Sequence, residues 1–232
     1  MLTLGSLTVP ISKYETKWST VNIGALVLHI LELQDFERTV DRLIDLLHAE
    51  GKRDIVPEDC PYFGQIWAAS RALATELEKR DLKDKKILEV GCGLALPSLT
   101  AALKGAYCQA FDLHKDVKYF LDQIIVRNKI DQKYFTYTES SWKTWPSTSQ
   151  EFDLIIGSDI LYENQHPGEL VTFLDSQLKK NGLALISDPC RWHHQHFIQS
   201  LKDAGMTVSF RYDWTQEDDK PVKICMIEAK KI

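Results

Sequence analysis

Gly91, Gly93 and Asp112 form the strongest chemical signal in the sequence. The two glycines follow the apolar segment 86–90, and Asp112 closes the next predicted strand, 19 residues after Gly93. A glycine turn lets backbone N–H groups approach a ligand closely, and a carboxylate about 20 residues further on is placed to bind ribose hydroxyls. The position three after Gly93 is Leu96, so the third glycine of a dinucleotide site is missing. The spacing therefore favours a nucleoside site without a pyrophosphate.

Asp159 and Tyr162 form a second group of candidates. They lie in the segment 157–163, directly after a predicted central strand. In an open α/β sheet the carboxyl ends of the central strands border the ligand crevice. We therefore place these two side chains at the reacting end of the site. A helix cap with a packed tyrosine is the alternative.

Three more side chains suit a site of this kind. An indole face at Trp67 suits a cationic ligand, and an indole at Trp142 could stack on a base. The alternatives are a core tryptophan at Trp67 and a surface-loop tryptophan at Trp142, with the neighbouring Trp145 taking its role. Glu89 lies in the strand before the glycine turn. A buried carboxylate needs hydrogen-bond partners, and the amides of the turn are the nearest supply.

Two further polar segments follow the later strands. Arg191 comes after the strand predicted at 183–187 and either binds an acidic substrate group or, as we favour, pairs with a surface carboxylate. His193, His194 and His196 crowd together, but no Cys or acidic residue stands at ligand spacing, so we expect a solvated helix start and no metal.

Alternating segments must position these residues. From Gly64 onward, strand-like and helix-like patterns alternate, which predicts βαβ units around a parallel sheet. The last two strands are joined by a loop and should therefore be antiparallel. The fold class is α/β, a doubly wound seven-stranded sheet with an antiparallel last strand. Strands are expected at 86–90, 107–112, 135–138, 152–157, 183–187, 207–213 and 222–228, and helices at 66–79, 97–105, 117–128, 168–179 and 194–204. Before them, residues 7–33 indicate strands or a hairpin, 36–49 an amphipathic helix and 52–61 a loop.

The glycine motif resembles that of the class I, seven-strand, S-adenosylmethionine-dependent methyltransferases. Their first motif has the form E/D-x-G-x-G, read here from Glu89 to Gly93, and their second strand ends in an acid, here Asp112. Ala95 stands where a third glycine is often found. The resemblance implies a Rossmann-like fold and S-adenosylmethionine as cofactor, with Asp112 on the ribose hydroxyls. The cofactor-binding set that it implies is Trp67, Glu89, Gly91, Cys92, Gly93, Asp112, Leu113, Trp142 and Ser158.

Three other segments are similar to methyltransferase family 16, which contains many protein lysine methyltransferases. They are 64–70, similar to G-x-x-W-P-A with Ala68 in place of proline, 140–143 with its tryptophan, and 157–163, which matches D-x-x-Y. This resemblance implies methyl transfer to a protein side chain, most often lysine. It places Trp67 at the methionine end of the cofactor and Trp142 at the adenine, and it makes Asp159 and Tyr162 the catalytic pair. Residues 1–55 would then be an N-terminal strand and helix extension, and residues 56–232 the methyltransferase domain, in one structural unit.

The net charge of the chain argues against nucleic acid as its main partner. The 28 Lys and Arg against 33 Asp and Glu give a formal charge of −5, which offers no general attraction to a phosphate backbone. The N/D-P-P-Y/F motif of base amino methyltransferases is also absent, so nucleic acid is not the expected acceptor. Two alternatives stay open: a small-molecule N-methyltransferase and a non-catalytic module that keeps the cofactor fold for binding a partner.

Location and assembly rest on weaker signals. The sequence has no apolar run of about 18 residues and no signal-peptide pattern at its start. Its five cysteines are odd in number and contain no CxxC pair, which fits a reducing compartment without a structural zinc. We expect a cytoplasmic monomer that makes no contact with a membrane.

Overall fold

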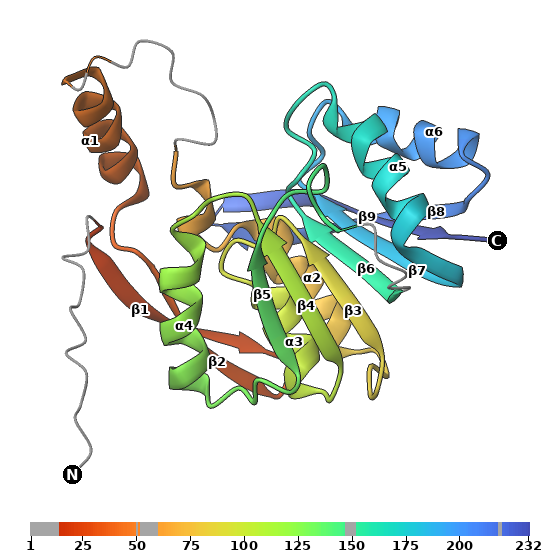
Figure 1. The fold of residues 1–232 in the computed structure, drawn as a ribbon, viewed down its shortest axis with the longest axis horizontal. Helices are drawn as coiled ribbons and strands as arrows, with labels where there is room; N and C mark the ends of the chain where they lie inside the picture. The colour runs from red at the N-terminus through yellow and green to blue at the C-terminus, as the bar shows by residue number, and fades with distance from the viewer. Residues whose placement is uncertain (1–13, 50, 52–59, 147–151, 218–219) are drawn as a thin grey trace.

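The computed structural model describes residues 14–49, 51, 60–146, 152–217 and 220–232. An antiparallel hairpin of β1 (Thr16–Ile23) and β2 (Leu26–Leu33) leads into helix α1 (Phe36–Ala49) (Figure 1). The helices that follow are η2 (Tyr62–Gly64, a short 3₁₀ turn), α2 (Ala68–Glu78), α3 (Leu96–Leu103), α4 (Val117–Asn128), α5 (His166–Gln177) and α6 (His194–Asp203). The strands are β3 (Lys86–Val90), β4 (Tyr107–Asp112), β5 (Phe135–Glu139), β6 (Phe152–Ser158), β7 (Leu178–Asp188), β8 (Thr207–Glu217) and β9 (Lys220–Lys230).

The seven later strands form one sheet in the order β5-β4-β3-β6-β7-β9-β8. The strands from β5 to β7 are parallel, and β9 runs antiparallel to both β7 and β8. Helices α2, α3 and α4 contribute to one apolar core, and α5 and α6 contribute to the other. The predicted fold class, a doubly wound sheet with an antiparallel last strand, is confirmed.

The central strands owe their apolar composition to burial on both faces. In β3 the side chains of Ile87 and Leu88 are both fully buried, and they belong to the two different cores. Successive side chains of a strand point to opposite faces, so a parallel strand covered by helices on both sides is mostly apolar. Most polar groups are therefore left for the ends of these strands, and the buried Glu89 in β3 is an exception.

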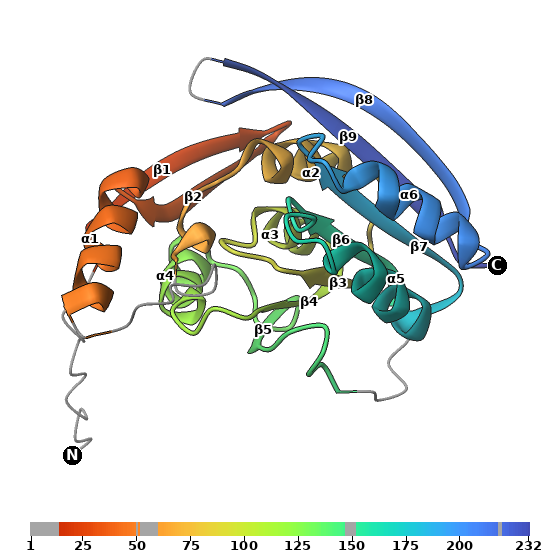
Figure 2. The same ribbon diagram turned by 90° about the horizontal axis from the view of Figure 1, so that it is seen from above.

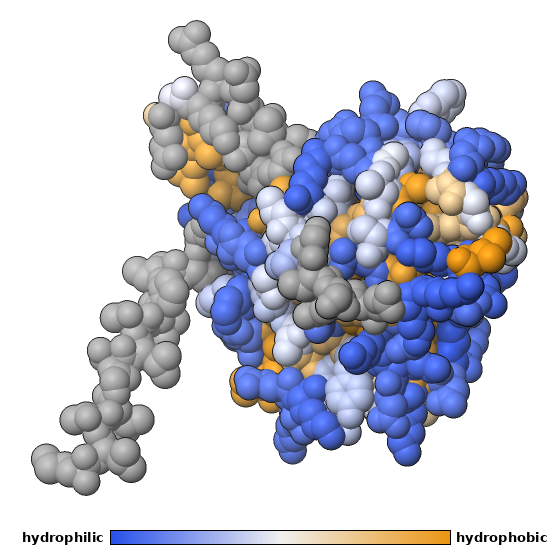
Figure 3. All heavy atoms as spheres, turned by 45° about the vertical axis from the view of Figure 1, so that its right-hand side comes forward, coloured by the Kyte–Doolittle hydropathy of each residue, from blue (hydrophilic) through white to orange (hydrophobic). Residues whose placement is uncertain are grey.

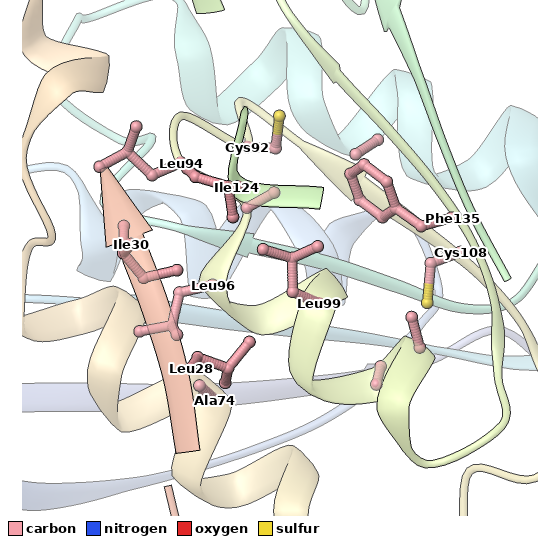
Figure 4. Close-up of a cluster of buried hydrophobic side chains, with 14 of the residues drawn as sticks. Leu28, Ile30, Ala74, Cys92, Leu94, Leu96, Leu99, Cys108, Ile124 and Phe135 are labelled. Carbon is pink, nitrogen blue, oxygen red and sulfur yellow. The ribbon is translucent and has the colours of Figure 1, made fainter. Parts of the chain in front are cut away.

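The N-terminal hairpin packs into the first core. Leu28 and Ile30 of β2 point toward Leu96 and Ala74 of the helices behind the sheet (Figure 4). The side chain of Asn128, at the end of α4, holds the backbone of His29 on both sides. Its Oδ1 accepts the His29 N–H at 2.7 Å, and its Nδ2 donates to the His29 carbonyl at 2.6 Å.

Replacing Asn128 with alanine should therefore loosen the hairpin. The change leaves one half-buried N–H and one carbonyl of His29 without their partners, at an expected cost of about 1–3 kcal/mol in the free energy of unfolding. Urea denaturation of the variant measures this cost. Asn22→Ala, at an exposed position of β1, is the matched control and should change stability by less than about 0.5 kcal/mol. An equal effect of both changes would show that Asn128 does not anchor the hairpin.

Two predicted boundaries were wrong. Helix α5 ends at Gln177 instead of 179, and β7 begins at Leu178 instead of 183. Leu178 is buried and pairs with Phe152, and the register then shifts across the residues around Asn181, whose φ is +64°, before Leu183 pairs with Leu154. The turn-like Asn-Gly pair thus lies inside an irregular strand and does not separate helix from strand.

The last two strands are longer than expected, because β8 and β9 pair continuously from Thr207 with Lys230 to Glu217 with Lys220. Helix α1 matches its predicted range, yet none of its residues is buried, and Figure 3 shows apolar side chains on its surface. The strand signals before residue 14 and most of the predicted 52–61 loop lie outside the described residues. None of the helices described is long and apolar enough to cross a membrane.

Candidate functional site

A cavity of about 390 Å³ lies at the carboxyl ends of β3, β4 and β6. Its size falls within the range of about 300–1,000 Å³ that is typical of ligand pockets. Ten of the eleven predicted site residues line it: Trp67, Gly91, Cys92, Gly93, Asp112, Leu113, Trp142, Ser158, Asp159 and Tyr162. The eleventh, Glu89, is fully buried in β3. The sheet order thus gathers at one place residues that are up to 95 positions apart in the chain.

The glycine turn is held by the acid at the end of the neighbouring strand. The backbone of Gly91 and Gly93 is left-handed, with φ values of +59° and +49°. A Cβ at Gly91 would lie 2.8 Å from Ile160 Cγ2, so the turn leaves no room for a side chain. Asp112 accepts the Gly93 N–H at 2.9 Å on one oxygen and the His114 N–H at 3.0 Å on the other. Burial raises the pKa of Asp112, and these N–H bonds oppose that rise.

The sequence suggested that the amides of the glycine turn are the partners of Glu89, but in the structure its partner lies elsewhere. Its Oε2 accepts the Ser98 N–H at 3.0 Å, and its Oε1 has no hydrogen-bond partner. Ser98 is in the first turn of α3, where N–H groups have no acceptor within their own helix, so the helix start supplies the partner. Burial raises the pKa of Glu89 from its usual 4.5 to about 8, although the hydrogen bond from Ser98 opposes this rise.

Glu89→Gln should remove a pH dependence of stability. Because the folded-state pKa lies above the ordinary value, the folded protein binds this proton more tightly than the unfolded chain. The free energy of unfolding should then fall as pH rises from about 5 to about 8, and the glutamine variant should lack that part of the fall. We expect the variant to gain about 2–4 kcal/mol relative to wild type across this window, measured by urea denaturation at several pH values. Glu139→Gln, at an exposed strand end, should follow wild type throughout. Identical slopes for Glu89→Gln and wild type would contradict the assignment.

The two tryptophans after β5 lie in different places. Trp142 lines the cavity, and its Nε1 donates to Glu169 Oε2 at 3.0 Å. Trp145 instead packs into the core, where it stacks on Phe111 with 4.8 Å between the ring centroids. Of the two aromatic candidates, Trp142 is therefore the one that could face a ligand.

Trp67 joins the N-terminal part of the chain to the cavity. Its ring lines the cavity and meets the ring of Phe36, the first residue of α1, edge to face at 5.4 Å. Its Nε1 donates to the Tyr62 carbonyl at 2.8 Å. The indole face is thus fixed by neighbours on two sides.

Asp159 is held from two directions at the rim of the site. Its φ is +55°, its N–H donates to the Ser187 carbonyl at 2.9 Å, and its side chain is only 8% exposed. Both carboxylate oxygens accept hydrogen bonds from Arg191, through Nε to Oδ1 and through Nη2 to Oδ2, the latter at 3.0 Å. Arg191 thus pairs with a carboxylate, as predicted, but with one that lines the cavity and not one on the open surface.

The ion pair stands beside a buried acid and an exposed tyrosine. Asp188 is fully buried, and its Oδ1 accepts the Arg191 N–H at 2.6 Å. Burial raises the pKa of Asp188 to about 6, with the hydrogen bond from Arg191 opposing the rise. Tyr162 is 49% exposed, and its ring meets the His166 ring at 4.7 Å. The cavity therefore has a rigid charged corner at Asp159 and an accessible phenol nearby.

Sequence reasoning missed several lining residues. Phe63 packs its ring against His114 at 4.5 Å, and its carbonyl would lie 3.3 Å from a Cβ at Gly93. Glu169 receives the Trp142 indole bond and an ion pair from Lys143 at 2.7 Å. His114 stands two residues after Asp112 and was detectable from that position alone. The others carry no local motif.

The histidine segment differs from its prediction. His194 begins α6 as expected, but it is buried, and its Nδ1 lies 2.6 Å from the Arg191 carbonyl oxygen. Among the residues that the structure describes, no group of three or more His, Cys, Asp or Glu side chains is arranged to hold a metal ion.

Comparison with known proteins shows to which family the chain belongs. A family model described as "Methyltransferase domain" matches residues 65–222, more than half of the chain. The chain belongs to the methyltransferase-domain family. The match runs from the segment before Trp67 into β9, so it includes every predicted site residue.

Curated relatives of this methyltransferase-domain chain are similar at moderate identity. It is 29% identical over 154 residues to the histidine protein methyltransferase 1 homolog of Dictyostelium discoideum, covering 64% of this chain and 47% of that protein. It is 29% identical over 137 residues to the protein-lysine methyltransferase METTL21E of Bos taurus, covering 55% of this chain and 47% of that protein. The chain thus spans about half the length of these relatives.

A solved structure supports the same fold. The magnesium protoporphyrin IX methyltransferase of Synechocystis superimposes with a TM-score of 0.58 at 15% identity, covering 86% of this chain and 98% of that one. At this identity the likeness concerns the fold alone.

Proposed function

We propose that this chain is an S-adenosylmethionine-dependent N-methyltransferase whose acceptor is a protein side chain, with lysine as the first candidate. The observation that carries the proposal is that one cavity at the strand ends brings together a glycine turn, the acid of the next strand and the Asp159–Tyr162 segment. The family to which the chain belongs supports methyl transfer, and the names of its curated relatives support a protein acceptor.

The cavity has the chemistry to hold an adenosine-containing cofactor. Gly91 and Gly93 line the cavity, and because neither has a side chain, a ligand can approach their backbone closely. Asp112 is fixed by two backbone N–H groups and, as a carboxylate, keeps further lone pairs for ribose hydroxyls. The Trp142 ring offers an aromatic face for the base. When bound, S-adenosylmethionine supplies a methyl group on a positively charged sulfur, which leaves as a neutral thioether.

Positioning is the main contribution that the acceptor end would make. Transfer to an amine is an in-line displacement, so orientation and exclusion of water carry most of the rate. In our proposal the Asp159 carboxylate accepts a hydrogen bond from the incoming nitrogen, and the Tyr162 hydroxyl bonds it or walls its path. Arg191 holds both carboxylate oxygens, so it fixes the direction of Asp159. A lysine must also lose a proton before it reacts, and a partly desolvated pocket lowers the pKa of an amine.

We also propose a cellular location, an oligomeric state and a domain organisation for the chain. We infer a cytoplasmic location, supported by the absence of disulfides among the described cysteines, and we infer a monomer. We also infer that residues 1–55 are an extension of a catalytic unit at 56–232. The hairpin of that extension shares its core with the helices behind the sheet, which supports one structural unit.

The test is cofactor titration followed by a transfer assay. Calorimetry with S-adenosylmethionine and S-adenosylhomocysteine should give micromolar binding to both. Tritiated S-adenosylmethionine, added with the enzyme to cell protein freed of small molecules, should then label a polypeptide at lysine. A parallel reaction with the separated small-molecule fraction tests the alternative, and label transferred from the cofactor only to a compound in that fraction would favour it. Binding without any transfer would favour the non-catalytic module, and the absence of binding would overturn the proposal.

A further inference from the structure

A second hollow lies next to the cavity. It has a volume of about 850 Å³ and runs between the end of β2, the start of α1, the segment before α2 and the end of β8. We call it the acidic groove. It shares Gln65, Ile66 and Trp67 with the cavity, so the two hollows are separated only by this short segment. Figure 2 shows the hairpin of β8 and β9 extending past β7 toward the N-terminal hairpin, which brings these distant segments to one groove.

Negative charge dominates the acidic groove. Among the described residues, its lining contains four carboxylates against two cations: Glu32, Asp35, Glu37 and Glu217 against Lys17 and Arg71. Four minus two leaves a formal charge of −2 on this surface. The Lys17 ammonium lies 3.9 Å from Glu32, so these two charges offset each other and leave Asp35, Glu37 and Glu217 against Arg71. A hollow lined by one sign of charge raises the local concentration of the opposite charge.

The protein itself fixes several of these carboxylates. The Glu217 side chain accepts the Ala68 N–H at 2.7 Å, and Asp35 accepts the Arg38 N–H at 3.0 Å. The Glu32 side chain is largely buried and accepts a hydrogen bond from Ser19. Carboxylates held in this way need little reordering when a cation arrives, so the groove is pre-organised for a positively charged partner.

The acidic groove also connects electrostatically with the reacting end. The pKa of Arg191 is raised, mainly by its hydrogen bonds to Asp159 and further by the negative charges of Asp159, Asp188 and Glu217. Burial of Arg191 opposes this rise. The Arg191 guanidinium is therefore attracted by the groove carboxylate Glu217 as well as by the cavity carboxylate Asp159. A chain bound in the groove would have its neighbouring residue beside Trp67, at the boundary with the cavity.

We propose that the acidic groove binds a basic segment of the protein substrate and thereby selects the side chain that enters the cavity. This inference rests on the proposed function, because it assumes a protein acceptor. The occupant is a polypeptide segment rich in Lys or Arg that flanks the methylated residue. Charge complementarity and the three shared lining residues select this occupant over an acidic or uncharged segment.

Charge changes in the groove test this proposal. The probe is a fluorescein-labelled peptide of alternating lysine and alanine, titrated by anisotropy into the full chain saturated with S-adenosylhomocysteine. Glu37→Lys, at an exposed groove position, should weaken binding by about 3- to 10-fold, and Arg71→Gln should strengthen it by about 2- to 5-fold. Effects of opposite sign cannot both arise from loss of folding. Raising the salt concentration should reduce both differences.

Asp45→Lys is the matched control, because it makes the same charge change at an exposed position of the same helix outside the groove lining. It should leave peptide binding within about 1.5-fold of wild type. A peptide of alternating glutamate and alanine should not bind. Equal weakening by Glu37→Lys and Asp45→Lys, unchanged affinity in Arg71→Gln, or equal binding of the glutamate peptide would each overturn the proposal.

Calorimetry with S-adenosylmethionine on the same variants separates the two levels of inference. Wild-type cofactor binding together with groove variants that leave peptide affinity unchanged would overturn the groove and keep the proposed function. If the wild-type chain itself does not bind S-adenosylmethionine, the proposed function is overturned, whatever affinity the peptide has.

Discussion

Replacing Asp112 with alanine is expected to weaken S-adenosylmethionine binding by about 100-fold or more. The change removes the acceptor for the N–H groups of Gly93 and His114 and the carboxylate proposed to take the ribose hydroxyls. Hydrogen bonds to a charged group contribute about 1.5–3 kcal/mol each, so the loss of two accounts for an effect of this size. Calorimetric titration with S-adenosylmethionine and S-adenosylhomocysteine measures it.

Asp131→Ala is the matched control for this change. Asp131 also accepts the N–H of the residue two positions on, Lys133, at 2.8 Å, but it is exposed and does not line the cavity. Its loss should leave cofactor affinity unchanged. Asp112→Asn, which keeps one acceptor oxygen, should fall between wild type and Asp112→Ala. Cofactor affinity within about threefold of wild type in Asp112→Ala would remove Asp112 from the site.

Asp159→Ala should lower the rate of methyl transfer by about 100- to 1,000-fold and leave cofactor affinity within a few-fold of wild type. The reason is that the carboxylate is proposed to orient the acceptor nitrogen, whereas the cofactor is proposed to be held by the glycine turn and Asp112. Single-turnover transfer from tritiated cofactor, with calorimetry on the same samples, separates the two effects. Full turnover together with full cofactor affinity would show that the role given to Asp159 is wrong.

Substitutions of Arg191 test the role of Asp159 independently, because Arg191 holds its carboxylate. Arg191→Gln removes the guanidinium that holds both oxygens of Asp159, so kcat should fall by about tenfold while the cofactor Kd stays unchanged. Arg191→Lys keeps the charge without the planar fork and should recover only part of the rate. Arg211→Gln is the control, because Arg211 is equally exposed, 44% against 43%, and pairs with Glu76 and Asp213 away from the cavity. Loss of rate in Arg211→Gln as well would assign the effect to general stability.

Much of the fold was predictable because the strands of a covered parallel sheet have a distinctive sequence. The strand at 86–90 and the helix at 117–128 were predicted with their observed bounds, since buried strands are mostly apolar and amphipathic helices repeat every 3.6 residues. The error at Leu178 has a physical cause. The Asn-Gly pair has the local chemistry of a turn, but backbone hydrogen bonds between Lys231 and both Asn181 and Gly182 hold this segment beside the sheet.

The candidate site was predictable where its chemistry is local. The turn at Gly91 and Gly93 needs left-handed backbone, which glycine adopts without strain, and this preference is written in the sequence. Ala95 is the exception, because it adopts the same conformation with φ of +55° where related motifs have a third glycine. Tertiary packing imposes that conformation on a residue that does not favour it.

By itself, then, the sequence determined the fold class, the glycine turn and the acid after it, because each depends on neighbours in the chain. Only the tertiary structure decided that Arg191 holds Asp159, that Glu89 bonds Ser98 instead of the turn, and that Phe63 closes against Gly93. These partners lie 32, 9 and 30 residues apart and carry no shared motif. Arg191 and Asp159 meet because the order of parallel strands brings the loops after β7 and β6 to one edge of the sheet. Ser98 and Phe63 reach their partners because α3 and the short turn η2 pack against that edge.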